Sequence, residues 1–577
     1  MKYDKFPAIP VPNAEAWSGW EAIGVQLKQA AGSINSTKKI IVLECYQGVA
    51  DEEMVPTLQN IFPDALWIDS RTCFKPGDEI EKMVYPDVTD DAIFGYITRL
   101  NMINYFDTGK LKAVQDRIAA NPGSAIIYGP GASLIEERPG LLVYFDMARW
   151  EIQLRMRANK VDNLGVQNKT APFSLQYKQA FFVDWRVCDR LKKKLFQRID
   201  YLIDTNKPEP KLIAGSTLLK ALESVVARPF RVVPFFDPGP WGGQWMKDVC
   251  DLDPSAVNYA WAFDCVPEEN SLLLQVKDTV IEIPSINLVF LQPEKLLGAK
   301  VYSRFGDEFP IRFDFLDTME GGNLSLQVHP LTEYIQEKFG MKYTQDESYY
   351  MMEAKPGAVV YLGLKKGIDK DAMIADLQTA QKGEELFDAD KYVNAFPVKK
   401  HDHVSIPAGT IHCSGTDSVV LEISATPYIF TFKLWDWGRM GLDGKPRPIN
   451  IEHGKNVMQW NRDTDWAQQH ALNLVEKVEE GDGYTEEKTG LNERQFIETR
   501  RHWFTKKVTH HTNGSVNVLN LVEGDAIIVE SPENKFDPFT VHYAETFIVP
   551  AFVQTYTIRP LHNNGKQHAT IKAYVRG

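Results

Sequence analysis

The chain has 577 residues, of which 44% are hydrophobic and 24% are charged, and its formal net charge is −13. This length predicts two or three domains, and the composition is that of an ordinary globular protein. The acidic balance argues against a nucleic-acid partner, so an anionic ligand such as a sugar phosphate would need a local positive pocket.

The six cysteines are scattered without a CxxC pair, which predicts reduced thiols. The N-terminal run MKYDKFPAIPVPN has no apolar stretch typical of a signal peptide. No run of apolar residues is long enough to cross a bilayer. We therefore expect a cytoplasmic location without a membrane partner, and the sequence leaves the oligomeric state open.

Residues 1–227 are predicted to form an α/β domain whose role the sequence does not give. Short apolar runs bounded by polar residues, Gly or Pro predict strands at 38–45, 124–131, 140–146 and 180–186. The mixed segment 189–206 has apolar residues at helical spacing and a basic face. Strands that alternate with helices predict a parallel sheet with crossover helices.

This architecture resembles the shape of P-loop nucleoside kinases, but without a Walker A loop. The first strand leads into YQGVADEE at 46–53, which has no lysine or hydroxyl placed to hold a β-phosphate and magnesium. GPGAS at 129–133 either forms a tight turn or cradles an anion with its backbone N–H groups. Asp146 and Asp184 end apolar runs and have either surface and capping roles or catalytic ones. We expect no ATP hydrolysis.

The content of Pro and Gly rises after Ala227, which places a domain boundary near 225–230. Residues 228–455 are predicted to form a metal-binding all-β domain, an antiparallel barrel of the cupin or jelly-roll kind. The expected strands are 280–291, 300–306, 310–317, 358–364, 403–413 and 419–425. Segment 367–390 is predicted as a helical insertion between strands.

Residues 456–502 are polar and acidic, and they are predicted to form a linker or irregular arm. Residues 503–577 return to strands and predict a small second cupin-like β domain. No metal is expected in this second barrel because it lacks a Gln-x-His run with a further His. His510 and His511 are expected at the surface.

Four residues of the predicted all-β domain have the types and spacing of a metal site. Gln327 and His329 are two apart and share one face of a strand. Glu347 follows eighteen residues after His329, and His412 follows sixty-five residues later. Two imidazoles, a carboxylate and an amide oxygen suit Zn²⁺ with positions left for water or substrate. His401 and His403 are instead expected on a solvated edge.

These residues also carry a family resemblance. The segments FPIRFDFLDTMEGGNLSLQVHP, DESYYMMEAKPGAVVYLGLKKG and VSIPAGTIHCSG resemble type I phosphomannose isomerases, as do PWGGQWM at 240–246 and WDWGRMGLDGKPRPINIEHG at 435–454. The resemblance spans about residue 230 to residue 577. It implies a zinc-dependent cupin-fold enzyme that interconverts mannose 6-phosphate and fructose 6-phosphate through a cis-enediol. One Zn²⁺ per chain would be held by Gln327, His329, Glu347 and His412.

The resemblance also suggests catalytic residues. The family holds the substrate phosphate with an arginine about twenty residues after the last zinc histidine, where this chain has Lys433. Arg439, six residues later, could substitute, and the alternative is that both are surface cations beside Trp435 and Trp437. Glu422 matches a family glutamate near the zinc, and is either an acid/base or a strand-edge carboxylate.

Three further residues are candidates for substrate binding. Ser325 shares a face with Gln327, and Gln345 stands where the family has a lysine. Trp241 either walls the pocket or packs in the core. Because these departures weaken the phosphate site, the alternatives are a non-catalytic sugar-phosphate-sensing protein or an isomerase of a related sugar. A phosphotransferase in the first domain is disfavoured by the missing Walker lysine.

Overall fold

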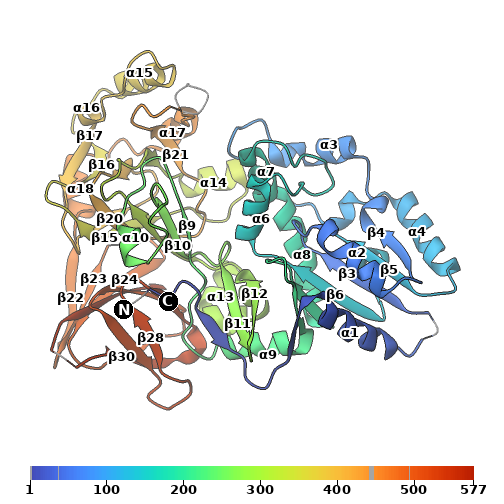
Figure 1. Cartoon of the computed structure of the whole chain (residues 1–577). Coiled ribbons are helices and arrows are strands. Elements are labelled where there is room, and N and C mark those ends of the chain that lie inside the picture. The colour runs from blue at the N-terminus through green and yellow to red at the C-terminus, as the bar shows by residue number, and fades with distance from the viewer. Residues whose placement is uncertain are drawn as a thin grey trace. The chain divides into compact units, whose positions relative to one another are not determined.

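The computed structural model describes residues 3–36, 38–440, 447–490, 492, 494–563 and 565–576. The chain divides into two compact units (Figure 1). The α/β unit comprises Ala8–Val225 and Pro267–Gln292, and the β unit comprises Met1–Pro7, Val226–Val266 and Pro293–Gly577. Among the described residues, no helix has both the length and the apolar character that crossing a membrane requires.

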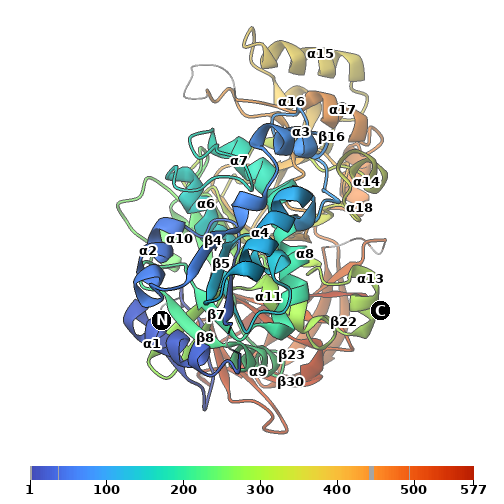
Figure 2. The same cartoon turned by 90° about the vertical axis from the view of Figure 1, so that its right-hand side faces the viewer.

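The α/β unit is built on a seven-stranded sheet of order β2-β8-β7-β6-β3-β5-β4 (Figure 2). Strands β3 to β7 are parallel, and β8 and β2 extend one edge antiparallel. The strands are β2 (Ala16–Ser18), β3 (Ile40–Cys45), β4 (Leu66–Asp69), β5 (Ala125–Gly129), β6 (Leu141–Asp146), β7 (Tyr201–Asp204) and β8 (Lys211–Ala214). The predicted parallel sheet with crossover helices is thus confirmed.

Helices α1 (Gly19–Gly32) and α2 (Asp51–Ile61) bury their apolar stripes on one face of this sheet. Their residues Ile23, Leu27, Met54 and Leu58 pack in one cluster with alternate residues of β3 and β6, as the two-residue period of a strand requires. The other α-helices of the segment Ala8–Val225 are α3 (Gly77–Val88), α4 (Thr108–Ala120), α5 (Ala132–Ile135), α6 (Arg149–Arg157), α7 (Phe173–Gln179), α8 (Trp185–Leu195) and α9 (Gly215–Val225).

Three segments predicted as strands are wholly or partly helical. Residues Ala180–Asp184 form a π-helical turn, η3, that runs into α8 and is buried throughout. Segment 280–291 is divided between β12 (Thr279–Pro284) and α11 (Ile286–Leu291), and 300–306 lies largely in α13 (Ala299–Phe305). Short apolar runs have the same signature in a buried strand and in a buried helix, which explains the errors at 180–184 and 286–291.

One predicted part of the metal-binding domain belongs to the α/β unit. The hairpin of β11 (Ser271–Val276) and β12 pairs through β11 with β1 (Ala8–Pro10) in a three-stranded sheet. Segment Pro267–Gln292 therefore folds with the α/β unit, although it follows the boundary expected near 225–230. This long-range pairing has no local signature in the sequence.

The first barrel of the β unit consists of a six-stranded sheet, β18-β15-β20-β13-β10-β9, and a five-stranded sheet, β17-β16-β19-β14-β21. Its strands are β9 (Phe235–Asp237), β10 (Trp261–Cys265), β13 (Ile311–Asp317), β14 (Leu326–Val328), β15 (Glu347–Ala354), β16 (Val359–Leu364), β17 (Val393–Pro397), β18 (His403–Ile406), β19 (His412–Ser414), β20 (Ser418–Ala425) and β21 (Phe432–Trp435). The predicted helical insertion contains α15 (Lys370–Gln381) and part of α16 (Ala389–Tyr392). The other α-helices of the β unit are α10 (Trp245–Val249), α12 (Pro293–Leu297), α13, α14 (Thr332–Phe339), α17 (Ile451–Val457) and α18 (Thr464–His470).

The second barrel has sheets of order β22-β23-β24-β31-β26-β29 and β25-β30-β27-β28 around a core that includes Phe504, Leu519 and Phe547. Its strands are β22 (Val475–Gly481), β23 (Tyr484–Thr489), β24 (Ile497–Phe504), β25 (Val508–His511), β26 (Asn517–Glu523), β27 (Ala526–Glu530), β28 (Phe539–His542), β29 (Thr546–Val549), β30 (Thr555–Pro560) and β31 (His568–Val575).

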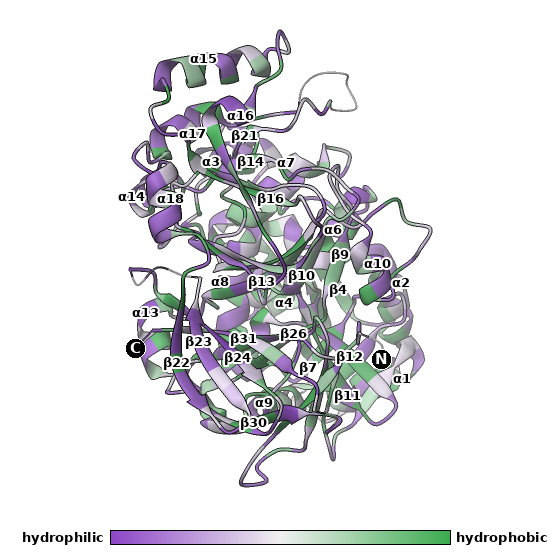
Figure 3. Cartoon of the chain, turned by 90° about the vertical axis from the view of Figure 1, so that its left-hand side faces the viewer, coloured by the Kyte–Doolittle hydropathy of each residue, from purple (hydrophilic) through white to green (hydrophobic). Residues whose placement is uncertain are grey.

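The segment 456–502, predicted as an irregular arm, is therefore largely ordered. It contains α18, β22, β23 and most of β24. Strand β22 is an exposed edge strand whose charged side chains make it largely hydrophilic (Figure 3). Charged side chains protect an edge strand from pairing with other chains. They also give the segment the polar composition of a loop, which is why it was not predicted as a strand.

Several polar residues expected at the surface are buried. His403 is fully buried, with its ring nitrogens 2.8 Å from the hydroxyls of Thr489 and Ser348. His510 is buried and stacks on Tyr556. Asp146 is also inside the protein, where its carboxylate accepts a hydrogen bond from Lys192 at 2.6 Å. Each of these polar groups is stabilised by neighbours that are distant in sequence.

Candidate metal centre

Strands of both sheets of the first barrel position the residues of the metal site. Gln327 in β14 lies opposite His412 in β19, while His329 follows the end of β14. Glu347 is the first residue of β15 in the other sheet. The exposed fractions are 8% for Gln327, 1% for His329 and 0% for Glu347 and His412. The barrel thus brings all four predicted ligands together in its interior.

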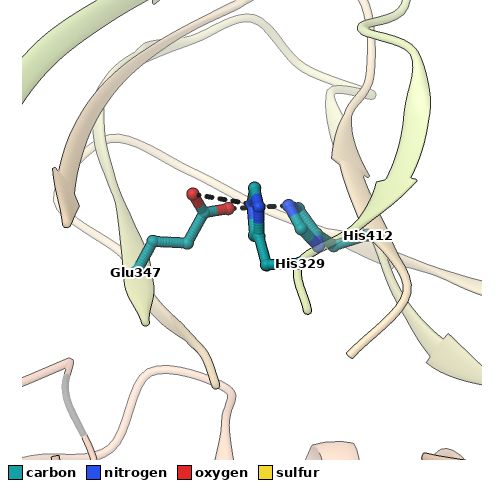
Figure 4. Close-up of side chains that lie close together, drawn as sticks. All are labelled: His329, Glu347 and His412. Carbon is teal, nitrogen blue, oxygen red and sulfur yellow. Dashed lines mark ion pairs between the residues drawn. The ribbon is translucent and has the colours of Figure 1, made fainter. Parts of the chain in front are cut away.

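The carboxylate of Glu347 lies against both imidazoles (Figure 4). Its Oε1 is 2.6 Å from His412 Nε2, and its Oε2 is 3.1 Å from His329 Nε2. Within the described residues, these three side chains form a cluster whose ligand atoms all lie within 4.8 Å of one another. A cluster this tight and this buried can hold one metal ion.

The hydrogen bonds of the two Nδ1 atoms determine which ring nitrogen of each histidine faces the carboxylate. His329 Nδ1 donates to the backbone oxygen of Phe430 at 3.1 Å, and His412 Nδ1 donates to that of Thr410 at 2.8 Å. Each neutral ring therefore presents the Nε2 lone pair inward, as metal-binding histidines do. Carboxylate oxygens and Nε2 lone pairs are all acceptors, so a proton or a cation must lie between them.

Without a metal, Glu347 and His329 favour each other's charged forms. Burial opposes protonation of His329, but the charge of Glu347 outweighs it and raises the pKa of His329. Burial likewise opposes ionisation of Glu347, yet His329 and His412 hold the pKa of that carboxyl well below its usual range. A divalent cation would satisfy the carboxylate and both lone pairs at once, so the residues present fit a metal.

Gln327 completes the donor set. Its Nε2 lies 3.3 Å from His412 Nε2. Because the oxygen and nitrogen of an amide have nearly the same shape, turning the side chain over would place Oε1 there. Two imidazole nitrogens, a carboxylate and an amide oxygen are a set that divalent transition metals accept.

Gln345, predicted as a substrate contact, is hydrogen-bonded to carboxylates instead. Its Nε2 donates to Glu347 Oε2 at 2.9 Å and to Glu422 Oε1 at 3.2 Å. Glu422 also forms an ion pair with Arg312, which lies 2.8 Å from Asp314. Burial and then repulsion from Glu347 raise the pKa of Glu422, against the attraction of Arg312. The network fixes the orientation of the Glu347 carboxylate.

The predicted phosphate-binding cations lie near the metal residues. Lys433 in β21 is directly opposite Gln327 in β14. Desolvation and then the charge of Arg447 lower the pKa of Lys433. The described residues include no hydrogen-bond acceptor or ion-pair partner for its ammonium group.

Arg439 is held by the protein itself. Its Nη1 lies 2.6 Å from Asp436 Oδ1, and Arg447 Nη1 lies 2.6 Å from Asp436 Oδ2. Ser325, predicted as a substrate contact, donates its hydroxyl to the same carboxylate at 2.7 Å. Together with Lys433, the cluster has three cations and one carboxylate, which leaves it positive.

Trp241 is buried and packs edge-on against Trp261 with ring centroids 4.8 Å apart.

The sequence analysis did not identify Arg312, Arg447 and Tyr349, which also lie in this region. The ring of Tyr349 lies edge-on to His412 at 5.7 Å, and its buried phenolic oxygen has no hydrogen-bond partner among the described residues. Its place two residues after Glu347 was the available signal, since alternate residues of a strand share a face.

Comparisons with known proteins agree with the motifs in part of the chain. A mannose-6-phosphate isomerase of Streptococcus mutans is 26% identical over 222 residues, which is 38% of this chain and 64% of that enzyme. The isomerase ManA of Bacillus subtilis is 24% identical over 236 residues, covering 41% of this chain and 69% of the enzyme. Part of this chain is homologous to mannose-6-phosphate isomerases. The resemblance stated from the motifs is thereby confirmed, although the chain spans less than two thirds of the first relative.

Two further findings complete the comparison. A solved structure of the Bacillus subtilis mannose 6-phosphate isomerase aligns with a TM-score of 0.48 and 17% identity, covering 60% of this chain and 99% of that one. Residues 19–227 match a family described as a domain of unknown function, DUF8485. The match to that family covers most of the first segment of the α/β unit.

Proposed function

We propose that the β unit is a zinc-dependent aldose–ketose isomerase that interconverts mannose 6-phosphate and fructose 6-phosphate through a cis-enediol. The observation that carries this proposal is the convergence of His329, Glu347 and His412 with both Nε2 atoms facing the carboxylate. The homology to mannose-6-phosphate isomerases supports the choice of substrate.

Gln327, His329, Glu347 and His412 would hold one zinc ion. When bound, the metal would supply a Lewis acid that polarises a carbonyl or hydroxyl oxygen of the sugar. The chain itself contributes a dry and rigid donor set, since the four residues are buried and both imidazoles are anchored by backbone carbonyls. Gln345 keeps the carboxylate of Glu347 oriented from behind.

Glu422 is the candidate for moving a proton between C1 and C2 of the sugar. Its Oε1 accepts from Arg312, Ser424 and Gln345, whereas its Oε2 has no hydrogen bond with a described residue. An acid/base needs one oxygen free for the substrate and a pKa near the working pH. Burial raises the pKa of Glu422 in that direction.

Lys433 would bind the substrate phosphate, with Arg439 and Arg447 adding positive potential. Lys433 is free of protein partners among the described residues, while both arginines are held by Asp436. An ammonium ion binds phosphate as a point charge and without the two-pronged geometry of an arginine. This arrangement favours attraction of the phosphate over strict orientation.

A coupled assay for fructose 6-phosphate formed from mannose 6-phosphate tests the proposal. Loss of a direct metal ligand in His412→Ala should lower kcat/KM by more than about 100-fold, since even outer-shell partners of a metal are worth 10–100-fold. His511→Ala, which removes an exposed imidazole of the second barrel, is the matched control. Turnover that survives complete removal of metal would refute the mechanism.

Lys433→Ala separates the isomerase from the alternative of a sugar-phosphate sensor. In an isomerase this change should raise KM for mannose 6-phosphate about tenfold or more, because a charge-assisted contact to phosphate is lost. Lys433→Arg should retain most of the affinity. Binding of mannose 6-phosphate to the zinc-loaded protein without turnover would instead support the sensor.

A further inference from the structure

The α/β unit has a cavity that the proposed isomerase reaction does not use. Its volume is about 490 Å³, and it lies at the carboxyl ends of the parallel strands β3, β4 and β5. Loops 46–52 and 160–169 line it together with Asp69, Arg71, Lys75 and Pro130. Open parallel sheets bind their ligands at this edge, and the volume lies in the range of about 300–1,000 Å³ that is usual for small-molecule sites.

The Gly-rich turn beside the cavity is already occupied by the protein's own carboxylate. Glu44, in β3, accepts a hydrogen bond from Gly131 N at 2.6 Å and another from Ser133 N at 2.8 Å. The carboxyl is buried, and burial raises the pKa of Glu44 to about 7. The GPGAS run is therefore a turn closed by Glu44, and the idea that it cradles an external anion is wrong. An anion in this cavity must be bound by side chains.

Arg71 is the fixed cation of the cavity. Its Nε and Nη2 donate to the two oxygens of Asp69 at 2.8 and 3.0 Å, and Nη2 also contacts Asp51. One guanidinium thus faces two carboxylates, so this set of three side chains keeps one negative charge. The third guanidinium nitrogen, Nη1, has no acceptor among the described residues, so one edge of a rigidly held guanidinium remains for a ligand.

The other charged side chains of the cavity differ in whether they have partners within the protein. The carboxylate of Asp162 accepts the backbone N–H groups of Asn168 and Lys169 at 2.6 and 2.5 Å. Glu52 is exposed at the lining. Lys75, Lys160 and Lys169 line the cavity, and none of them has an ion-pair partner within the described part of the chain. The lining therefore carries four cations and four carboxylates, and the charged side chains left without a hydrogen bond or ion pair among the described residues are the three lysines and Glu52.

The polar wall behind these cations is rigid. Gln47, buried in the loop after β3, accepts from Trp185 Nε1 at 3.0 Å and donates to the backbone oxygen of Asp162 at 2.9 Å. Asn163 donates to Asp184 at 2.7 Å, and Asp184 is the last residue of the π-helical turn η3. Such turns are frequent at functional sites. Both lining segments are thus held in place before a ligand arrives.

We propose that this cavity of the α/β unit binds a phosphorylated small molecule, whose phosphate group contacts Arg71 and the lysines Lys75, Lys160 and Lys169. The committed carboxylates keep Arg71 in position, while the free ammonium groups provide the attraction. This inference does not depend on the isomerase activity of the β unit, because every lining residue belongs to the α/β unit.

Titration calorimetry of the full chain with glycerol 3-phosphate tests the proposal. All samples carry Lys433→Ala, so that the phosphate site proposed for the β unit does not contribute. The double variant Lys75→Ala/Lys169→Ala should bind about tenfold more weakly or worse, and added salt should weaken binding in the unaltered cavity. The double variant Lys28→Ala/Lys194→Ala removes two exposed lysines of the same unit and is the matched control.

Glycerol replaces glycerol 3-phosphate in a second titration and should not bind. Three results would each overturn the proposal: equal affinity in the two double variants, binding of glycerol as tight as that of glycerol 3-phosphate, or no saturable binding of the phosphate at millimolar concentration in the control variant. Far-ultraviolet circular dichroism checks that both double variants are folded, which is expected because the four lysines are not buried.

Discussion

His403 should make the β unit sensitive to acid. The side chain is completely buried between the two barrels' strands β18, β15 and β23, and its two ring nitrogens contact Thr489 and Ser348. Burial and then the charge of Arg501 lower the pKa of His403 from 6.5 to about 3. The folded protein therefore keeps this imidazole neutral, whereas the unfolded chain protonates it at mildly acidic pH.

The sign and size of the effect follow from these two values. The folded pKa lies below the unfolded one, so the stabilisation is complete above pH 6.5 and is lost as the pH falls from 6.5 towards 3. At pH 5 the loss in the free energy of unfolding is about 2 kcal/mol relative to neutral pH, and its limit below pH 3 is about 4–5 kcal/mol. His403→Gln cannot protonate and should not show this loss.

Urea unfolding of the wild type and His403→Gln at pH 7.5 and pH 5 measures the difference. The variant is less stable at pH 7.5, because glutamine does not reproduce the ring packing, but its deficit should shrink by about 2 kcal/mol at pH 5. His511→Gln, which removes an exposed imidazole, is the control. An equal deficit of His403→Gln at both pH values would refute the assignment of a buried neutral histidine.

Other changes test the same barrel. Gly490→Ala should destabilise the protein by about 1–3 kcal/mol in urea, because the residue has φ +77° and a Cβ there would overlap the ring of His403. Arg312→Met should cost about 3–5 kcal/mol by the same assay, since it leaves the buried Glu422 carboxylate without its partner. Gln345→Leu should weaken Zn²⁺ binding about 10–100-fold in a chelator competition, through loss of the hydrogen bond to the metal-binding carboxylate. A chelator should lower the melting temperature, and Zn²⁺ should restore it; an unchanged melting temperature would count against a metal at this site.

The four candidate ligands could be chosen from the sequence because each has a local signature. Gln327 and His329 show the two-residue period of a strand, and His412 follows a Gly turn after another strand. The opposition of Gln327 and His412 in the sheet then brings them together. Strand alternation and family-like flanks sufficed to select these residues.

The supporting contacts could not be predicted, because they depend on residues far apart in the chain. The carbonyl of Phe430 that anchors His329 is 101 residues away, and Arg312 reaches Glu422 across 110 residues. The helical segments 180–184 and 299–305 were also misassigned. Residues 180–184 are buried on all sides, which removes the periodicity that distinguishes a helix from a strand. Helix α13 buries only Val301 and Phe305, whose four-residue spacing is helical.

The two departures from the family pattern have a common electrostatic consequence. Where the family has a lysine next to the metal-binding glutamate, Gln345 supplies hydrogen bonds to Glu347 and Glu422 but no charge. The cation that faces these carboxylates is Arg312, which is buried and ion-paired with Glu422 from a different strand. A buried carboxylate pair without any cation would be strongly destabilising, so a positive charge is required here whichever residue provides it. On the other side of the site, Lys433 is free and Asp436 holds two arginines. The positive charge around the candidate metal site is thus divided between Arg312, which faces the carboxylates, and Lys433, which has no ion-pair partner among the described residues.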